Sequence, residues 1–489
     1  MNTLPESNSN LLFALREILP EEYLLTKIED LKPYECDALS VYQRLPIAVA
    51  LPSTIEEVQK IVHACESLRV PVVARGAGTG LSGGVLPHEG GIILSLSRFN
   101  RILEIDNEGM TMRVQPGVCN LAISEAAAPY GLYYAPDPSS QIACTIGGNV
   151  AENAGGVHCF KYGLTVHNVL EVKIITAEGD LVTLGSTTLD TPGYDLLALI
   201  TGSEGMLGII VEVVVKLLPR PPETKVLMAS FDSLKDATDA VTNILSTGII
   251  PAGLEMMDNL AIQATEKFAH TRYPIDAEAI LLCELDGLVE ELKEEVNLVA
   301  QIFREANSVR VVMVSSESEK TRLWAGRKAV FSAIGGLSPD NYCMDIVIPY
   351  KNIVAVLEKI HSLSNHYDLQ VANVLHAGDG NLHPFILFDA AIKEELKKAK
   401  HFAMDILSLC LKMGGTITGE HGVGFEKLDQ MCLQFNEDEL THLHKIKYAF
   451  DPYDLLNPDK VIPTVHQCAK LDVVCPDHKE LSHSAIPRF

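Results

Sequence analysis

The chain has 489 residues, of which 47% are hydrophobic and 21% charged, and its formal net charge is -25. Domains usually hold ~100–200 residues, so this length predicts two or three packed units, and the composition excludes a disordered chain. The acidic charge argues against a nucleic-acid-binding or lipid-docking protein, and it requires any anion site to be locally basic.

No segment approaches the ~20 apolar residues of a transmembrane helix, and residues 1–10 do not resemble a secretory signal. The 11 cysteines are widely spaced and form no Cys-x-x-Cys motif. Buried, reduced thiols in a cytoplasmic protein are therefore expected. An intrinsic iron–sulfur cluster of the ferredoxin type is excluded, so any electrons must pass to another protein.

The first half of the chain is predicted to contain a helix at 55–68 among short strands. Apolar residues recur there at helical spacing, and Ser53 with Glu56 is typical of a capping box. Strands are predicted at 70–74, 92–96, 110–115, 169–176 and 209–218.

Arg220-Pro221-Pro222 is the best candidate for a domain boundary, because the pattern downstream changes to longer helices with isolated strands. Helices are predicted near 233–247, 286–306, 318–334, 350–366, 391–413 and 436–449. Strands are predicted near 226–231, 280–285, 309–315, 343–348, 370–376 and 385–388. This order indicates an α+β fold rather than a regular βαβ array.

A glycine-dense loop between two predicted strands, residues 75–91, is the first chemical signal. Glycines let the backbone take positive φ and turn N–H groups toward an anion, which suits a pyrophosphate. The spacing Gly78-x-Gly80-x-x-Gly83 formally matches the dinucleotide fingerprint, but Gly84 and Pro87 preclude the helix that must follow it. The Gly-Lys-Ser/Thr ending of a nucleotide triphosphatase loop is also absent.

Two further glycine-rich segments, residues 136–156 and 202–208, complete a pattern of three loops. In this order and spacing they resemble the FAD-linked oxidases of the vanillyl-alcohol oxidase and p-cresol methylhydroxylase type. The resemblance implies that 75–84 wraps the FAD pyrophosphate and that the other two loops line the ribityl chain and the isoalloxazine ring. The implied cofactor-binding residues are Arg75, Gly76, Gly78, Thr79, Gly80, Ser82, Gly83, Pro136, Ser139, Ser140, Thr145, Gly147, Gly148, Asn149, Asn153, Gly155, Gly156, Glu204, Gly205, Ile210 and Asn457.

The resemblance also implies a domain organisation. It predicts an N-terminal helical segment at 1–40, an FAD-binding domain at 41–220 and an α+β substrate domain at 221–415. A C-terminal segment at 416–462 is expected to return to the FAD domain, and 463–489 is expected to be a peripheral tail. Some relatives attach FAD through His or Cys. His158 and Cys159 lie close to the second loop, but we expect non-covalent FAD.

The second half carries two histidines, His376 and His383, on either side of a Gly-Asp-Gly-Asn turn. Such a turn predicts a hairpin that brings both imidazoles to one place. Glu420 follows from a separate glycine-flanked segment. Two His and one Glu make an open site for a divalent Zn, Mn or Fe ion. His421 then remains as a base, since an ordinary pKa of ~6.5 suits proton abstraction.

Arg327 lies on a predicted helix, and these motifs together resemble the 2-hydroxy-acid dehydrogenase branch of the family, which acts on D-lactate, D-2-hydroxyglutarate or glycolate. In that branch the matching Arg holds the substrate carboxylate. The resemblance spans roughly residues 11 to 466 and is strongest to the FAD-binding subunits of bacterial glycolate dehydrogenases. Cys343 stands where the 2-hydroxyglutarate enzymes have Lys, which favours a small monocarboxylate.

The implied reaction is oxidation of glycolate, with D-lactate as a second substrate, by hydride transfer to FAD. The implied partners are a second FAD-domain subunit and an iron–sulfur subunit, so a cytoplasmic protein held peripherally at the inner face of the membrane is expected. Two alternatives stay open. One is a D-lactate dehydrogenase with a different acceptor, and the other is an FAD-binding scaffold subunit without activity of its own.

Overall fold

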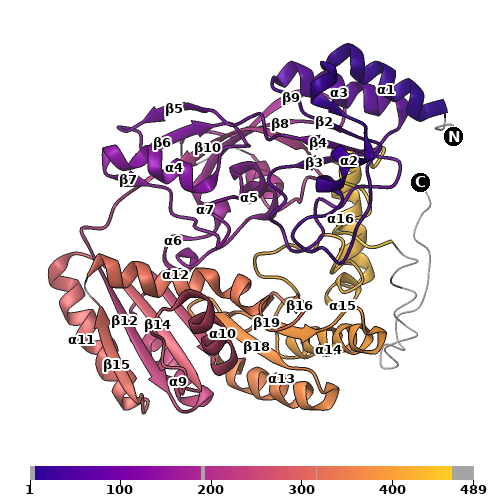
Figure 1. Ribbon diagram of the computed structural model, residues 1–489. Coiled ribbons are helices and arrows are strands. Elements are labelled where there is room, and N and C mark those ends of the chain that lie inside the picture. Colours follow the sequence, from indigo (N-terminus) through magenta and orange to yellow (C-terminus); the bar gives the residue numbers. More distant parts are fainter. Residues whose placement is uncertain (1–5, 189–192, 315, 465–467, 469–489) are drawn as a thin grey trace.

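The computed structural model describes residues 6–188, 193–314, 316–464 and 468. It shows two mixed α/β regions, one above the other in Figure 1, with a C-terminal segment that runs back to the first. The α+β fold predicted from the sequence is confirmed.

The upper region is built on two sheets. The first has four strands in the order β1 (Leu24–Leu25), β2 (Ala48–Ala50), β4 (Ile92–Ser95) and β3 (Val72–Arg75). The second is antiparallel, in the order β5 (Ile102–Asp106), β6 (Thr111–Val114), β10 (Ile209–Lys216), β8 (Val169–Ile175) and β9 (Leu181–Gly185). The short strands β7 (Leu132–Tyr133) and β11 (Leu218–Pro219) pair with each other. All five strands predicted in this region are present.

Helices of the upper region pack on these sheets and connect them. They are α1 (Glu6–Ile18), α2 (Ile28–Leu31), α3 (Ile55–Leu68), α4 (Asn120–Ala127), α5 (Ile146–Glu152), α6 (Cys159–Tyr162), α7 (Thr165–Asn168) and α8 (Leu196–Ile200). Helix α3 has the predicted bounds, but its capping box lies one residue later than predicted. The Thr54 hydroxyl accepts from the Glu57 backbone N–H at 3.2 Å, and the Glu57 carboxylate accepts from the Ser53 and Thr54 N–H groups.

The lower region is one antiparallel sheet covered on both faces. Its strands are β15 (Arg310–Val314), β12 (Glu223–Phe231), β14 (Ala279–Gly287), β13 (Gly253–Asp258), β18 (Val371–His376), β19 (Asn381–Phe388) and β16 (Asp340–Cys343), with β17 (Ile346–Val347) also on β19. Helices α9 (Leu234–Ser246), α11 (Val289–Glu305), α13 (Ile353–Tyr367) and α14 (Lys393–Lys412) pack on one face. Helices α10 (Asn259–Ala269) and α12 (Glu317–Ile334) pack on the other.

Two features of the lower region differ from the sequence-based expectation. The strand predicted at 343–348 is divided into β16 and β17, because the carboxylate of Asp345 between them is fully buried and binds a loop instead of continuing the strand. Strand β13 and helix α10 were not predicted, since the segment 253–269 mixes apolar and charged residues without a clear period.

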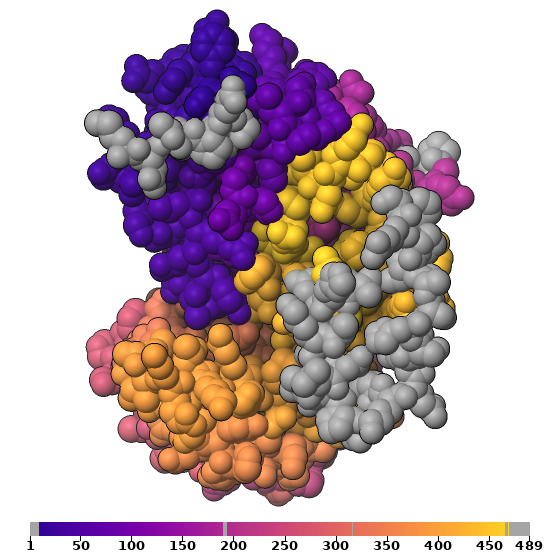
Figure 2. All heavy atoms as spheres, turned by 90° about the vertical axis from the view of Figure 1, so that its right-hand side faces the viewer, coloured from indigo at the N-terminus to yellow at the C-terminus, as the bar shows by residue number. Residues whose placement is uncertain are grey.

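The C-terminal segment carries α15 (Met431–Gln434) and α16 (Glu437–Phe450) and ends against the upper region. Val72 on β3 donates to Leu455 O at 2.8 Å, and Asn457 N donates to Val72 O at 2.9 Å. Figure 2 shows this yellow segment lying between the indigo upper region and the orange lower region. The two regions are therefore joined by the chain at 220 and again by this segment.

The prediction that the cysteines are reduced is wrong for one pair. Cys432 and Cys468 form a disulfide with a Cα–Cα distance of 5.5 Å, across 36 residues of sequence. Their spacing gave no signal, because only the fold brings residue 468 beside α15. Eight other cysteines are free, and Cys475 lies outside the described residues, as does most of the predicted 463–489 tail. None of the helices in the described ranges is long and apolar enough to cross a membrane.

Lys447 should be essential for docking the C-terminal segment. Its buried Nζ donates to Asp451 Oδ2 at 2.6 Å, to Leu456 O at 2.8 Å and to Met206 O at 2.9 Å. Lys447→Met removes the buried counter-charge of Asp451 and the donor to the Leu456 and Met206 carbonyls, so the free energy of unfolding in urea should fall by about 3–5 kcal/mol. The control Lys235→Met removes an exposed ion pair and should leave unfolding unchanged. Equal unfolding curves for both variants would contradict the prediction.

Candidate active site

A cavity of about 480 Å³ lies between the two regions and collects residues that are far apart in the sequence. The upper region contributes the glycine loop after β3, the loop at 138–145 and helix α5. The lower region contributes α12, β18 and β19, and the C-terminal segment contributes Glu420 and His421. The imidazole and carboxylate groups therefore face the same space as the glycine loop.

The hairpin predicted around the Gly-Asp-Gly-Asn turn is β18–β19, and its register explains why both histidines face one way. Val374 pairs with His383, and His376 lies two residues beyond Val374. Side chains two apart, or directly opposite, lie on the same face of a sheet. The two imidazoles thus meet on the cavity face, with ring centroids 5.3 Å apart.

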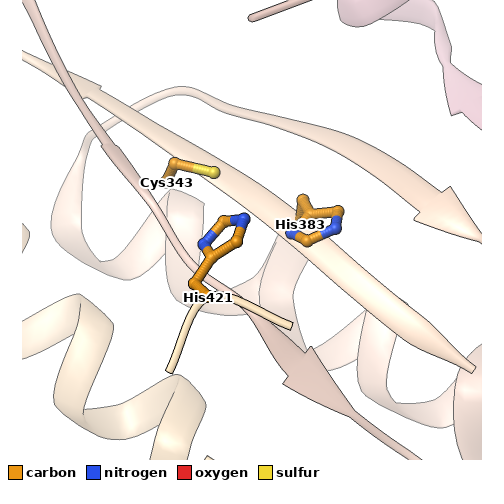
Figure 3. Close-up of side chains that lie close together, drawn as sticks. All are labelled: Cys343, His383 and His421. Carbon is orange, nitrogen blue, oxygen red and sulfur yellow. The ribbon is translucent and has the colours of Figure 1, made fainter. Parts of the chain in front are cut away.

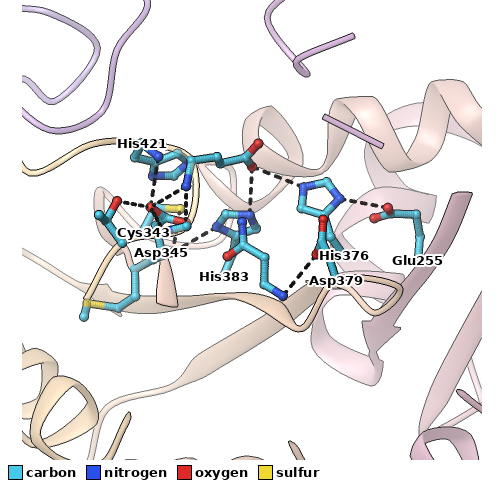
Figure 4. A network of polar contacts seen from close by, with 12 residues as sticks. Glu255, Cys343, Asp345, His376, Asp379, His383 and His421 are labelled. Atoms are coloured by element: carbon cyan, nitrogen blue, oxygen red, sulfur yellow. Dashed lines mark hydrogen bonds and ion pairs between the residues drawn. The ribbon is translucent and has the colours of Figure 1, made fainter. Parts of the chain in front are cut away.

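Glu420 completes this set. Its Oε1 lies 3.2 Å from His376 Nε2 and 3.1 Å from His383 Nε2. The remaining ring nitrogens are also held, since His376 Nδ1 lies 2.8 Å from Glu255 Oε1 and His383 Nδ1 lies 3.1 Å from Met344 O. Figure 4 shows Glu255, His376 and His383 within this network of contacts. Partners on the outer nitrogens fix ring orientation and tautomer, as they do around metal-binding histidines.

The loop that carries Glu420 and His421 is held by a buried carboxylate on each side. Asp345 Oδ2 accepts from Gly419 N and His421 N, both at 2.9 Å, and from the Thr418 hydroxyl at 2.7 Å. Glu204 of the upper region accepts from the next part of the loop, from Val423 N and Gly424 N, both at 2.7 Å. This explains how adjacent side chains leave strand geometry and address one site, as the flanking glycines predicted.

Burial and neighbouring charges determine the protonation states here. Burial disfavours the charged form of the His376 imidazole, but the carboxylates of Glu255 and Glu420 outweigh burial and raise the pKa of His376 well above its ordinary value. Burial of Glu420 disfavours its ionised form, but the imidazoles of His376 and His383 outweigh burial and hold the pKa of Glu420 well below its usual range. This part of the site therefore stabilises positive charge between two carboxylates.

His421 differs from the sequence-based expectation. Burial lowers its pKa to about 4, so the ordinary value does not apply and the imidazole is neutral at neutral pH. Its ring stacks on that of His383, with centroids 5.0 Å apart and planes 17° apart. A neutral imidazole retains a free lone pair and can accept a proton.

A second set of potential ligands overlaps the first. Cys343, His383 and His421 also have ligand atoms within 4.8 Å of one another, and Figure 3 shows their side chains side by side. Both ring nitrogens of His383 already face Glu420 and Met344 O, and burial raises the pKa of the Cys343 thiol well above its ordinary value. The set His376, His383 and Glu420 is therefore the better cation site.

Arg327 lies on the cavity side of α12 and is 3% exposed. Its Nε donates to Glu255 Oε2 at 2.7 Å, and its Nη2 lies 3.5 Å from both ring nitrogens of His376. Glu255, which sequence reasoning missed, thus orients Arg327 and His376 together. Its only signal was a charge within the apolar run Leu254 to Met257.

Most residues predicted to bind the cofactor line the cavity or the smaller pocket behind it. They are Arg75, Gly76, Gly78, Thr79, Gly80, Ser139, Ser140, Thr145, Gly147, Gly148, Asn149, Gly155, Glu204, Gly205 and Ile210. Ser82, Gly83, Pro136, Asn153, Gly156 and Asn457 line neither space. At least one of these residues holds a loop that lines the cavity. Asn457 Nδ2, for example, donates to Gly84 O at 2.9 Å and to Glu204 O at 2.7 Å.

The cavity has the character of a cofactor site. Thr145 lines it, and its Oγ1 is buried without a hydrogen-bond partner in the described structure. Gly78 has a φ of +71°, and a Cβ at Gly76 would lie 2.3 Å from Thr145 Oγ1, so the loop admits backbone where a side chain could not fit. The sequence missed Asp37 and Glu152, which also line this space.

Comparison with known proteins identifies the class. Residues 46–185 match the family model of an FAD binding domain, and residues 220–461 match that of the C-terminal domain of FAD linked oxidases. Glycolate oxidase subunit GlcD of Escherichia coli (strain K12) is 56% identical over 99% of this chain and 98% of that protein. A D-lactate dehydrogenase of Anaerostipes hadrus is 34% identical over 91% and 96%. The solved structure of p-cresol methylhydroxylase has a TM-score of 0.79 at 18% identity, covering 95% and 98%.

The chain belongs to the FAD-linked oxidases, with an FAD-binding domain followed by the C-terminal domain of that family. It is an FAD-dependent oxidoreductase of the vanillyl-alcohol oxidase and p-cresol methylhydroxylase fold.

Gly147 should be required for full FAD occupancy. A Cβ there would lie 2.5 Å from Pro116 Cβ, so Gly147→Ala forces α5 away from Pro116 at a cost of about 1–3 kcal/mol. FAD binding should weaken about tenfold, measured as the visible flavin absorbance retained after dialysis. Gly335→Ala is the matched control, because its Cβ meets nothing closer than 3.4 Å. Unchanged flavin content in Gly147→Ala would contradict the prediction.

Proposed function

We propose that the protein oxidises a small 2-hydroxy monocarboxylate, glycolate or D-lactate, to the 2-oxo acid. One observation carries the proposal: two imidazoles, a carboxylate and a guanidinium converge at one end of the cavity that the FAD-binding loops line. The 56% identity with a glycolate oxidase subunit supports it. FAD, when bound, supplies the acceptor for the hydride.

His376, His383 and Glu420 would hold one divalent ion, with Zn, Mn or Fe suited to these ligands. The fit rests on the geometry, because both Nε2 atoms face the same carboxylate oxygen and both outer nitrogens are already oriented. It also rests on charge, since Glu255 and Glu420 enclose a position that favours a cation. Such an ion would act as a Lewis acid on the substrate oxygens.

Arg327 binds the substrate carboxylate in this proposal. Its Nε donates to Glu255, which fixes the orientation of the guanidinium, and Arg327 lines the cavity. A planar fork of two N–H groups matches a carboxylate. It also supplies the local positive charge that an anionic substrate needs in a protein of net charge -25.

His421 accepts the hydroxyl proton as the Cα hydrogen leaves with its electron pair. The neutral imidazole is available for this, and Asp345 holds its backbone N–H in place at 2.9 Å. Burial, which lowers the pKa, makes His421 a weak base, so the reaction depends on a hydroxyl that is itself acidified.

Part of the cavity lining favours a short substrate. Cys343, Val374, Phe385 and Phe331 carry no charge, and Lys328, the cation beside Arg327 in the lining, is paired with Asp137 at 3.5 Å. This lining agrees with the choice of a monocarboxylate over 2-hydroxyglutarate. It does not separate glycolate from D-lactate. The identity with a D-lactate dehydrogenase keeps that enzyme, with another acceptor, as the second candidate.

Electrons from reduced FAD must leave the chain, because the cysteine pattern lacks the motif of an intrinsic cluster. We infer a second FAD-domain subunit and an iron–sulfur subunit as recipients, which would place the protein peripherally at the inner face of the membrane. The similar Escherichia coli protein is named a subunit, which supports an assembly. A scaffold role without activity is disfavoured by the complete set of His376, His383, Glu420 and His421.

His421→Ala tests the base. The variant should retain FAD, since His421 is not part of the glycine loops, and its flavin should be reduced about 10²–10⁴-fold more slowly by glycolate or D-lactate under anaerobic conditions. Stopped-flow bleaching of the visible flavin bands measures the rate, and the same assay ranks the two substrates. The control His442→Ala changes an exposed residue on α16 and should behave like the wild type. Normal bleaching in His421→Ala would remove it from the base role.

Metal content tests the ligand set. Mass spectrometry of the wild type should find about one divalent ion per chain, and His383→Ala should lose most of it while retaining FAD. Chelation should stop flavin reduction, and Zn, Mn or Fe should restore it. Full activity in a metal-free preparation would refute the metal.

A further inference from the structure

A polar cluster at the junction of the two regions has no part in the proposed chemistry. It consists of Asp137 and His158 from the FAD domain and of Glu284, Trp324 and Lys328 from the lower region, and we call it the junction cluster. His158 precedes α6, Glu284 lies on β14, and Trp324 and Lys328 lie on α12. The sequence singled out His158 only as a possible point of flavin attachment.

His158 bridges the two regions through both ring nitrogens. Its Nδ1 lies 3.0 Å from Asp137 Oδ2, and its Nε2 lies 3.1 Å from Glu284 Oε1. Its backbone N–H also donates to Asp137 Oδ1 at 3.2 Å. On the far side, the Trp324 indole N–H donates to Glu284 Oε2, and Lys328 Nζ lies 3.5 Å from Asp137 Oδ2.

The charges of the cluster balance. Only the imidazolium form of His158 donates from both nitrogens, and each nitrogen faces a carboxylate. Burial opposes that form, but Asp137 and Glu284 raise the pKa of His158 well above its ordinary value. The imidazolium and Lys328 thus offset the two carboxylates. If His158 or Glu284 loses its charge, its buried partner is left without a counter-charge.

The cluster connects the two walls of the active-site cavity. Trp324, Arg327 and Lys328 share one side of α12, because residues three and four apart are neighbours on a helix. Trp324 and Lys328 bind the cluster, while Arg327 and Lys328 line the cavity. On the other wall, Asp137 directly precedes residues 138–140, which line the cavity on the FAD side.

We propose that His158 is a positioning residue that fixes the distance between the flavin-side loop at 136–140 and Arg327 on α12. It acts through Glu284 and Trp324 on one side and through Asp137 on the other, and it does not touch the substrate. The inference rests on the proposed function, in which Arg327 grips the substrate carboxylate. Since Arg327 would grip it in the ground state and in the transition state alike, a displaced α12 should raise KM more than it lowers kcat.

His158→Gln tests the proposal in the full chain with FAD bound. KM for glycolate or D-lactate should rise about tenfold or more, with a smaller change in kcat and unchanged flavin content. Trp324 is the only tryptophan of the chain, so its fluorescence reports on α12 directly. Its emission and its quenching by acrylamide should change in the variant. Glu284→Gln, which keeps shape and removes charge, should reproduce both effects and replaces His158→Gln if that variant does not fold.

Lys161→Met is the matched control. Lys161 Nζ donates to Asp286 O at 2.7 Å and pairs with the Asp286 carboxylate, so it also joins α6 to β14, and these polar contacts do not involve α12. This variant should leave KM within about twofold of the wild-type value. The emission of Trp324 and its quenching by acrylamide should be unchanged. An equal rise in KM for Lys161→Met, or no rise in both cluster variants, would overturn the inference.

Failure of the proposed function is recognised separately. Wild-type protein whose flavin no 2-hydroxy acid reduces would refute that function, whatever the variants do. Trp324 quenching would then decide the inference alone, and identical quenching in wild type and His158→Gln would overturn it.

Discussion

The buried carboxylate of Asp345 is the contact on which the site depends. It is 0% exposed, it accepts from the backbone of Gly419 and His421, and Lys427 Nζ lies 3.3 Å away as its buried counter-charge. Burial opposes ionisation, yet Lys427, His421 and His383 hold the pKa of Asp345 well below its usual range. These hydrogen bonds fix a short stretch of a glycine-rich loop, which carries Glu420 and His421 to the hairpin histidines.

The same loop also joins the two halves of the molecule. Asp345 holds its first part from the lower region, and Glu204 holds its second part from the FAD domain. Because the two carboxylates bind consecutive stretches of one loop, the position of Glu420 and His421 relative to the glycine loops follows from backbone hydrogen bonds. The parallel bridge between Val72 and Leu456, and the buried Lys447, anchor the rest of the C-terminal segment to the same domain.

Glu255 likewise holds other residues in position, next to the proposed binding place of the substrate carboxylate. One oxygen faces His376 and the other accepts from Arg327, so a single buried carboxylate orients a metal-binding residue and a carboxylate-binding residue of the proposed site. The junction cluster repeats the principle at the edge of the cavity, where His158 is held between Asp137 and Glu284.

The sequence alone determined the α+β class, the glycine-rich loops and the hairpin of His376 and His383, because hydrophobic period, glycine spacing and turn residues are local properties. The assignment of those loops to a flavin came from the resemblance to a family. It located α3 but placed its capping box one residue early, since Ser53 and Thr54 both fit the motif. Glu255, the break at Asp345, the junction cluster and the Cys432–Cys468 disulfide came only from the tertiary structure. Each depends on partners tens or hundreds of residues away in the sequence. A single charged residue or cysteine shows no sequence pattern from which its partner could be predicted. The lowered pKa of His421 has the same origin, because burial is a property of the fold and not of the residue.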